Sequence, residues 1–296
     1  MPGTVTKRTN LQKTTPLFRG LPIVKKKGNG VKNNPLLIER NGSICTLVLN
    51  RPEKKNSLTP GLVELLLTTL DELSRDGSIR VLIIRGAGDQ AFCSGYDIGS
   101  LPTQTDDDTS PADMDRLTPV ESLFDALIHF PWPVIAMLNG MAFGAGCELA
   151  LCCDIRIAAD DIRIGMPPAK LGIVYPWRGL SRFIQTIGLQ TTREMFFTGR
   201  TCKGPQLKEM GLVDHLVPRE ELTGLTGRMA EDIARNAPLA LKGTKQVINL
   251  ILDAGQPEEH PQKTAESITE AAFKSADAAE GKRAFLEKRK PIFKGR

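Results

Sequence analysis

Short apolar runs alternate with amphipathic helical stretches along most of this chain of 296 residues. The runs Ser43–Asn50, Arg80–Arg85 and Pro133–Leu138 are apolar on both faces, which is typical of strands covered by helices on both sides. Two further strand-like runs follow, Asp154–Ala158 and Ile162–Met166. Strands separated by crossovers of helix length pair in parallel. The pattern therefore predicts an α/β fold with a core of parallel strands.

Helix-start signals lie between these runs. Thr59 can cap a helix that has Pro60 in its first turn, and the same Thr-Pro pair recurs at Thr118-Pro119, before a helix that runs to Phe130. The first helix carries a leucine stripe at helical spacing, formed by Leu62, Leu65, Leu66, Leu70 and Leu73.

The pattern after Val217 is helical only. The predicted helices are Glu220–Asn236, Pro238–Asp253 and Lys263–Arg289, the last interrupted near Ser275–Ala278. The polar stretch Pro102–Asp115 predicts a loop or lid. We divide the chain into an N-terminal arm (residues 1–34), an α/β core (35–235) and a helical C-terminal region (236–296).

The N-terminal arm holds the chain's excess of positive charge. Residues 1–34 contain eight Lys or Arg and no acid, so the rest of the chain carries a net charge of −3. The arm is rich in Thr, Asn, Pro and Gly, which predicts a flexible extension. We expect no nucleic-acid partner. With no apolar run near 18 residues and no signal-peptide core, we expect no membrane association and a cytoplasmic location, with the mitochondrial matrix as the alternative.

A glycine-rich turn leads into a predicted helix within the stretch Asn139–Ala150. The first N–H groups of a helix attract negative charge, and the small residues around Ala145 leave them accessible. Glu148 follows three residues later, beside apolar residues that would raise its pKa toward a useful range. The stretch can be an oxyanion site beside a base, but an acid in a first helical turn also fits an ordinary helix start.

Several other kinds of site are excluded by their spacing. Gly144–Leu149 lacks the third glycine of a dinucleotide loop, and no glycine loop ends in Gly-Lys-Ser/Thr. Cys147, Cys152 and Cys153 are poorly spaced for a tetrahedral metal site, so we expect buried thiols and no metal. The three histidines, His129, His215 and His260, lie outside these motifs, which argues against a histidine-based triad.

Five segments in order resemble the crotonase, or enoyl-CoA hydratase/isomerase, superfamily over about residues 36–296. They are Leu49–Leu58, Ala91–Ile98, Asn139–Asp154, Gly188–Val217 and Ala284–Pro291. The resemblance implies a crotonase-like spiral of ββα units with a C-terminal helical trimerisation region. It also implies an acyl-CoA substrate, no cofactor beyond the coenzyme A that is part of that substrate, and a homotrimer or dimer of trimers.

The resemblance assigns roles to individual residues. The backbone N–H groups of Tyr96 and Ala145 would hold the thioester oxygen, and Glu148 would move a proton. Each such donor contributes about 3 kcal/mol to stabilising an enolate. Coenzyme A would contact the backbone near Cys93, Ser94, Asp97 and Ile98, and Phe285 and Lys288 of a neighbouring subunit would lie near its adenine and phosphates.

One departure from the family pattern limits the reaction. Hydratases of this family have a second glutamate in a Gly-x-Pro-Glu segment, whereas this chain has Gly165-Met166-Pro167-Pro168. Downstream, the segment around Tyr175 resembles methylmalonyl-CoA decarboxylase, a family member. We therefore expect an enzyme of the hydratase/isomerase type, with a carboxyacyl-CoA decarboxylase as the alternative. An oligomeric scaffold or RNA-binding protein that uses the basic arm is a third hypothesis.

Overall fold

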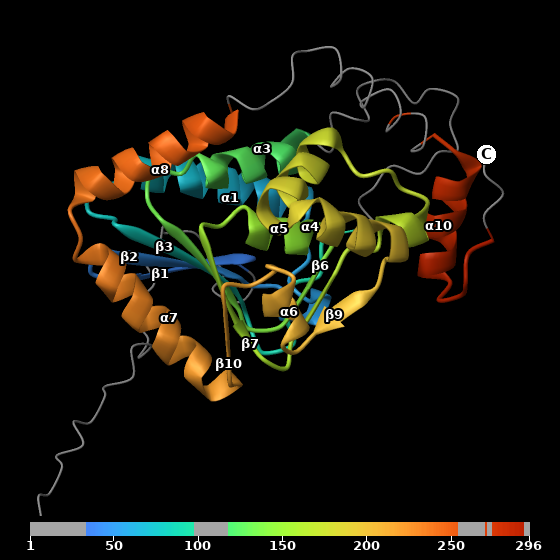
Figure 1. The fold of residues 1–296 in the computed structure, drawn as a ribbon, viewed down its shortest axis with the longest axis horizontal. Helices are drawn as coiled ribbons and strands as arrows, with labels where there is room; N and C mark the ends of the chain where they lie inside the picture. Colours follow the sequence, from blue (N-terminus) through green and yellow to red (C-terminus); the bar gives the residue numbers. More distant parts are fainter. Residues whose placement is uncertain (1–33, 98–117, 254–269, 271–273, 293–296) are drawn as a thin grey trace, which may run out of the picture.

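The computed structural model describes residues 34–97, 118–253, 270 and 274–292. The predicted lid Pro102–Asp115, most of the arm, and residues 263–269 and 271–273 of the last predicted helix lie outside this part of the chain. Figure 1 shows a central sheet with helices on both sides and the helix α10 (Ala276–Leu286) at the far end of the molecule.

The larger sheet has six strands in the order β1-β2-β3-β5-β7-β10. The pair β1/β2 is antiparallel and every other neighbouring pair is parallel, so the predicted parallel core is confirmed. The strands are β1 (Leu36–Asn41), β2 (Ile44–Leu49), β3 (Val81–Gly86), β5 (Val134–Leu138), β7 (Ile155–Ala159) and β10 (His215–Val217). The side chains of β2 and β5 are buried along their whole length, because helices cover both faces of the sheet.

A second sheet of four short strands carries the segments that form the site. Its order is β4 (Ala91–Cys93), β6 (Met141–Phe143), β8 (Arg163–Gly165) and β9 (Thr201–Lys203), with β8/β9 antiparallel and the other pairs parallel. Strand β8 confirms the run predicted at Ile162–Met166. Because β4 and β6 are parallel neighbours, their carboxyl ends meet at one edge.

The predicted helices begin at or near their sequence signals, whereas α5 and α6 were not predicted. Thr59 caps α1 by accepting a hydrogen bond from the Leu62 backbone N–H at 3.3 Å, and α4 begins at Ala145, directly after the glycine-rich turn. The helices are α1 (Pro60–Ser74), α3 (Thr118–Ile128), α4 (Ala145–Leu151), α5 (Trp177–Thr198), α6 (Gln206–Glu209), α7 (Arg219–Ala234), α8 (Pro238–Asp253) and α10, with 3-10 turns η1 (Pro52–Lys54) and η3 (Pro168–Leu171).

Helix α10 packs against η3 of its own chain. A Cβ atom added to Gly281 would lie 2.2 Å from the Leu171 carbonyl oxygen, and one added to Gly172 would lie 2.7 Å from that of Asp277. Glycine is required at both positions, because any side chain would push the two elements apart. Among the described residues no helix is long and apolar enough to cross a membrane.

Candidate active site

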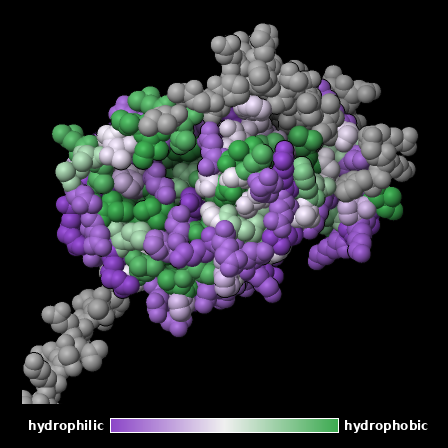
Figure 2. All heavy atoms as spheres, viewed as in Figure 1, coloured by the Kyte–Doolittle hydropathy of each residue, from purple (hydrophilic) through white to green (hydrophobic). Residues whose placement is uncertain are grey.

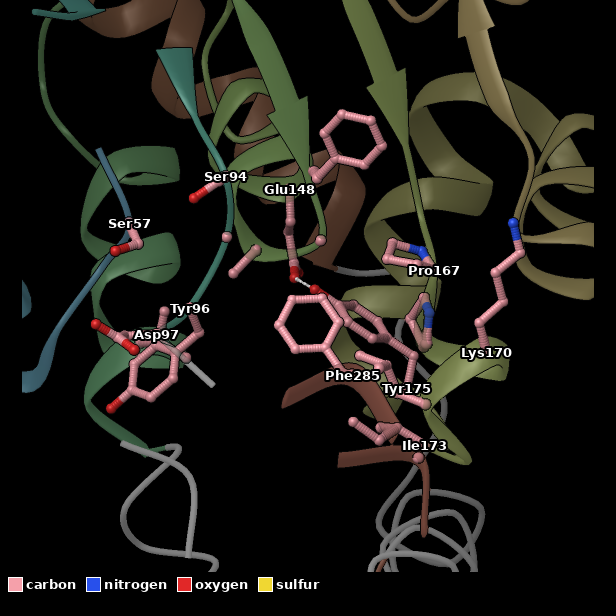
Figure 3. Close-up of a pocket in the computed structure, with 18 of the residues that line it drawn as sticks. Ser57, Ser94, Tyr96, Asp97, Glu148, Pro167, Lys170, Ile173, Tyr175 and Phe285 are labelled. Atoms are coloured by element: carbon pink, nitrogen blue, oxygen red, sulfur yellow. Dashed lines mark hydrogen bonds between the residues drawn. The ribbon is translucent and has the colours of Figure 1, made fainter. Parts of the chain in front are cut away.

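A cavity of about 820 Å³ opens at the edge where β4, β6 and α4 meet. Its wall is completed by α3, by the segment from η3 to the start of α5, and by α10 (Figure 3). The lining includes most of the predicted site residues, namely Ser94, Tyr96, Asp97, Ala145, Glu148, Tyr175 and Phe285. Segments far apart in the sequence therefore form one hollow.

Tyr96 lines this hollow, and its pairing with Leu58 sets the direction of its backbone groups. The Leu58 N–H donates to the Gly95 carbonyl at 2.9 Å, and the Asp97 N–H donates to the Leu58 carbonyl at 2.8 Å. Backbone groups alternate in direction along an extended segment, so the Tyr96 N–H points away from Leu58. Gly95 allows this path with a φ of 106°, in the region that favours glycine.

Ala145 is the first residue of helix α4. Gly144, the residue before it, has φ 52° and ψ −125°. The Gly144 carbonyl accepts hydrogen bonds from the N–H groups of Cys147 and Glu148. The Ala145 N–H lies in the first turn, where no helical acceptor exists. In the part of the chain that the structure describes, neither this N–H nor that of Tyr96 has a hydrogen-bond acceptor.

Two glycines allow these segments to approach each other. A Cβ atom added to Gly146 would lie 2.2 Å from the Cys93 carbonyl oxygen, and one added to Gly95 would lie 2.8 Å from that of Phe143 and 3.5 Å from the Ala145 nitrogen. The glycine-rich sequence thus permits the close approach that leaves two unpaired donors beside one cavity.

Glu148 is fully buried on α4, and both of its oxygens have partners. Oε1 accepts a hydrogen bond from Arg182 Nη1 at 2.7 Å, and Oε2 accepts one from the Tyr175 hydroxyl. Burial, followed by the negative charge of Glu121, raises the pKa of Glu148 from 4.5 to about 7, although Arg182 and Tyr175 oppose the shift. A carboxyl with such a pKa can accept or give a proton near neutral pH.

Tyr175 is held against Glu148 by aromatic packing. Its ring lies 5.3 Å from that of Phe196 and 6.3 Å from that of Phe183, measured between centroids. Burial and the charge of Glu148 raise the pKa of Tyr175 well above its ordinary value, so the hydroxyl keeps its proton and donates. Figure 3 shows this donation across the cavity.

Arg182 and Glu121 were not predicted as site residues. Arg182 is on α5 and joins Glu148 to two acids of α3, donating to Glu121 Oε2 at 2.9 Å and to Asp125 Oδ1 at 2.8 Å. Arg178 also donates to Asp125, at 2.5 Å. In the sequence these residues look like the polar faces of two amphipathic helices. The only sequence signal for a buried site residue was the position of Arg182 among the apolar residues around Phe183.

The position of the missing second glutamate also lies at the cavity. Pro167 and Pro168 both line the wall, Pro168 as the first residue of η3. A proline side chain has no proton to exchange, so this wall supplies no second acid, as the sequence predicted.

The predicted coenzyme A contacts have different outcomes. Ser94, Asp97 and Phe285 line the cavity, whereas Cys93 is fully buried behind it and Ile98 lies outside the described residues. Lys288 is exposed and is not part of the cavity lining. Phe285 lines the cavity of its own chain, because α10 packs on η3. The contact expected from the Phe285 and Lys288 of a neighbouring subunit stays a prediction.

The cysteines agree with the expectation of buried thiols. All six are free and buried, and burial raises the pKa of Cys93 to about 12, which disfavours the thiolate. Within the described ranges, no group of three or more His, Cys, Asp or Glu residues is arranged to hold a metal ion.

Comparisons with known proteins agree with this site. The family model described as enoyl-CoA hydratase/isomerase matches residues 39–296. The chain is 34% identical to 2,3-dehydroadipyl-CoA hydratase of Escherichia coli over 269 residues, which cover 88% of this chain and 99% of that protein. It is 32% identical to human mitochondrial methylglutaconyl-CoA hydratase over 267 residues, covering 88% of this chain and 76% of that protein.

A solved structure of methylmalonyl-CoA decarboxylase with 2-nitronate-propionyl-CoA is also similar. It superposes with a TM-score of 0.81 at 29% identity, over 89% of this chain and 99% of that one. The family match covers more than half of the chain and includes every segment that forms the cavity. The chain is an enzyme of the enoyl-CoA hydratase/isomerase family, with the crotonase fold.

Proposed function

We propose that the protein acts on an acyl-CoA thioester through an enolate, in a reaction of the hydratase/isomerase type. The observation that carries the proposal is the placement of two unpaired backbone donors, at Tyr96 and Ala145, in one cavity with the buried carboxyl of Glu148. The named relatives that hydrate CoA esters support the choice of substrate class.

The two N–H groups would stabilise the negative charge that develops on the thioester oxygen. They belong to the backbone and their directions are fixed by the Leu58 pairing and by the start of α4, so no reorganisation is needed during the reaction. Each such donor contributes about 3 kcal/mol at the transition state.

Glu148 would move a proton to or from carbon, or activate water by accepting one of its protons. Its raised pKa keeps both protonation states accessible near neutral pH, and Tyr175 would hold the carboxyl and relay a proton toward the acyl group. No metal or redox cofactor takes part in this scheme. Coenzyme A would arrive as part of the substrate and would contact the lining residues Ser94, Asp97 and Phe285.

A carboxyacyl-CoA decarboxylase is the second candidate. Loss of CO₂ needs the oxyanion donors but no strong base, and here Pro168 replaces the second acid while both oxygens of Glu148 are already bonded. The similarity to methylmalonyl-CoA decarboxylase supports this candidate as well.

We further propose a homotrimer or a dimer of trimers. Helix α8 leaves apolar side chains exposed at Leu239, Val247, Ile248 and Leu250, and Figure 2 shows apolar atoms gathered in the region of α8. Such a patch is typical of an interface. We place the protein in the cytoplasm, with the mitochondrial matrix as the alternative because the human relative is mitochondrial.

One experiment separates the two reactions. The purified protein is incubated with enoyl-, dienoyl- and malonyl-type CoA thioesters, and the products are weighed by mass spectrometry. Gain of one water indicates hydration, loss of CO₂ indicates decarboxylation, and an unchanged mass with altered absorbance indicates isomerisation. Unchanged thioesters throughout the panel, with no binding, would contradict the proposed function.

A further inference from the structure

Two carboxyl groups of the cavity share one guanidinium nitrogen. Arg182 Nη1 donates to Glu148 Oε1 at 2.7 Å and to Glu121 Oε2 at 2.9 Å. Glu121 lines the cavity from α3, and Glu148 lines it from α4. Arg182 therefore couples a second acid to the one that the proposed function uses.

The charges of this cluster do not balance. Three carboxyl groups, Glu148, Glu121 and Asp125, surround two guanidinium groups, Arg182 and Arg178. Among the residues that the structure describes, one acid of this cluster is left without a compensating cation. Because the Glu148 side chain is 1% exposed and those of Glu121 and Asp125 are 20% and 36% exposed, Glu148 is the acid for which ionisation costs most.

We propose that Glu121 is a positioning residue for this reaction: through its shared hold on Arg182 and its own charge, it keeps Glu148 able to take up a proton near neutral pH. The inference rests on the proposed function, in which Glu148 transfers that proton. Glu121 and Glu148 then form a pair of acids in the cavity, although Pro168 occupies the position of the family's second glutamate.

The groups that face Glu148 from each packed element agree with this role. Helix α5 supplies Arg182 and α3 supplies Glu121, while Tyr175 donates from the segment before α5. The neighbouring thiols, Cys147 of α4 and Cys152 directly after α4, have raised pKa values, because they are buried, and stay neutral. After burial itself, the charge of Glu121 is the largest cause of the raised pKa of Glu148.

Asp125 provides a matched control. It also accepts from Arg182, but from the other terminal nitrogen, Nη2. Its charge is offset by Arg178 and screened by solvent, and it does not line the cavity. Removing the charge of Asp125 should therefore affect Glu148 much less than removing that of Glu121.

The test compares E121Q and D125N with the wild type, with the protonation of Glu148 as the readout. Glutamine keeps an oxygen that accepts from Arg182 and removes only the charge. Infrared difference spectra record the C=O stretch of the protonated carboxyl as a function of pH, and the band is assigned by its loss in E148Q. The pH profile of turnover is measured on the thioester that the panel identifies.

We expect the Glu148 midpoint in E121Q to fall by about one pH unit, because a negative neighbour that raised its pKa is gone. The midpoint in D125N should move by less than about a third of that. In the pH profile of turnover, the midpoint that reports Glu148 should shift by the same amount as the infrared midpoint. An unchanged midpoint in E121Q, or an equal shift in D125N, would overturn the inference. Absence of turnover with the infrared shift intact would instead count against the proposed function alone.

Discussion

Arg182 forms a buried ion pair with Glu148, with its Nη1 2.7 Å from Glu148 Oε1. The pairing fixes one oxygen of the carboxyl and leaves the other to the Tyr175 hydroxyl. The acid of this site is thus oriented from both sides.

Tyr175→Phe should lower turnover by about 10- to 10³-fold with little loss of stability, because one hydroxyl that orients Glu148 is removed. The ring contacts with Phe183 and Phe196 remain. The measurement is steady-state kinetics together with the melting temperature. Tyr175→Ala serves as the comparison and should also melt earlier, because it removes the ring. If Tyr175→Phe turns over like the wild type, the hydroxyl has no part in the reaction.

Gly146→Ala should lower turnover by more than about tenfold and reduce stability by about 1–3 kcal/mol. The added methyl group would meet the Cys93 carbonyl and force apart the segments that carry the Tyr96 and Ala145 donors. Gly61→Ala in α1 is the control, since a Cβ atom there meets nothing within 4 Å and alanine favours a helix. Equal turnover and stability in the two variants would show that the close approach of β4 to α4 is not needed for the reaction.

Stability should depend on pH through Glu148. Its pKa is raised from 4.5 to about 7 in the folded protein, so the folded state holds the proton more tightly than the unfolded chain. This contribution to stability is fully present below about pH 4.5 and is lost as the pH rises to about 7. The slope should be smaller in Glu148→Gln, as melting temperatures between pH 4.5 and 7.5 would show. Parallel curves for the two proteins would contradict the raised pKa.

Deletion of residues 1–34 should leave acyl-CoA turnover and oligomeric state unchanged. The first strand, β1, begins at Leu36, and the arm's sequence offers no apolar face to bury. Kinetics and size-exclusion chromatography of the shortened protein test this. Loss of activity or of the oligomer would show that the arm is needed for catalysis or for assembly.

Much of the larger sheet could be predicted from the sequence. Strands β2, β3 and β5 are long apolar runs between clear turn signals, and α1 and α4 begin at a Thr-Pro pair and a glycine turn. Strands β4, β6, β9 and β10 were not predicted, because three residues are too few to show a period. Strand β8 is equally short, but it lies within the longer strand-like run Ile162–Met166. The strand β1 was missed as well, since its edge position leaves half of it polar.

The site was predictable only where its residues lie close together in the sequence. Ala145 and Glu148 share one helical turn, so their proximity follows from local structure. Arg182 is 34 residues from Glu148, and Glu121 is 61 residues from Arg182. No spacing rule links them, because the contact is made by the packing of α3, α4 and α5. The placement of α10 on its own chain likewise depends on the tertiary fit at Gly281.

The most direct test of the account is the turnover of Glu148→Gln on the thioester that the panel identifies. We expect turnover to fall by about 10²-fold or more, because the substitution removes proton transfer. The Kd of an unreactive thioether analogue should change by less than about threefold, because binding does not need that proton transfer. Circular dichroism and oligomer size should match the wild type. Turnover within a few-fold of the wild type would contradict the account and remove Glu148 from the mechanism.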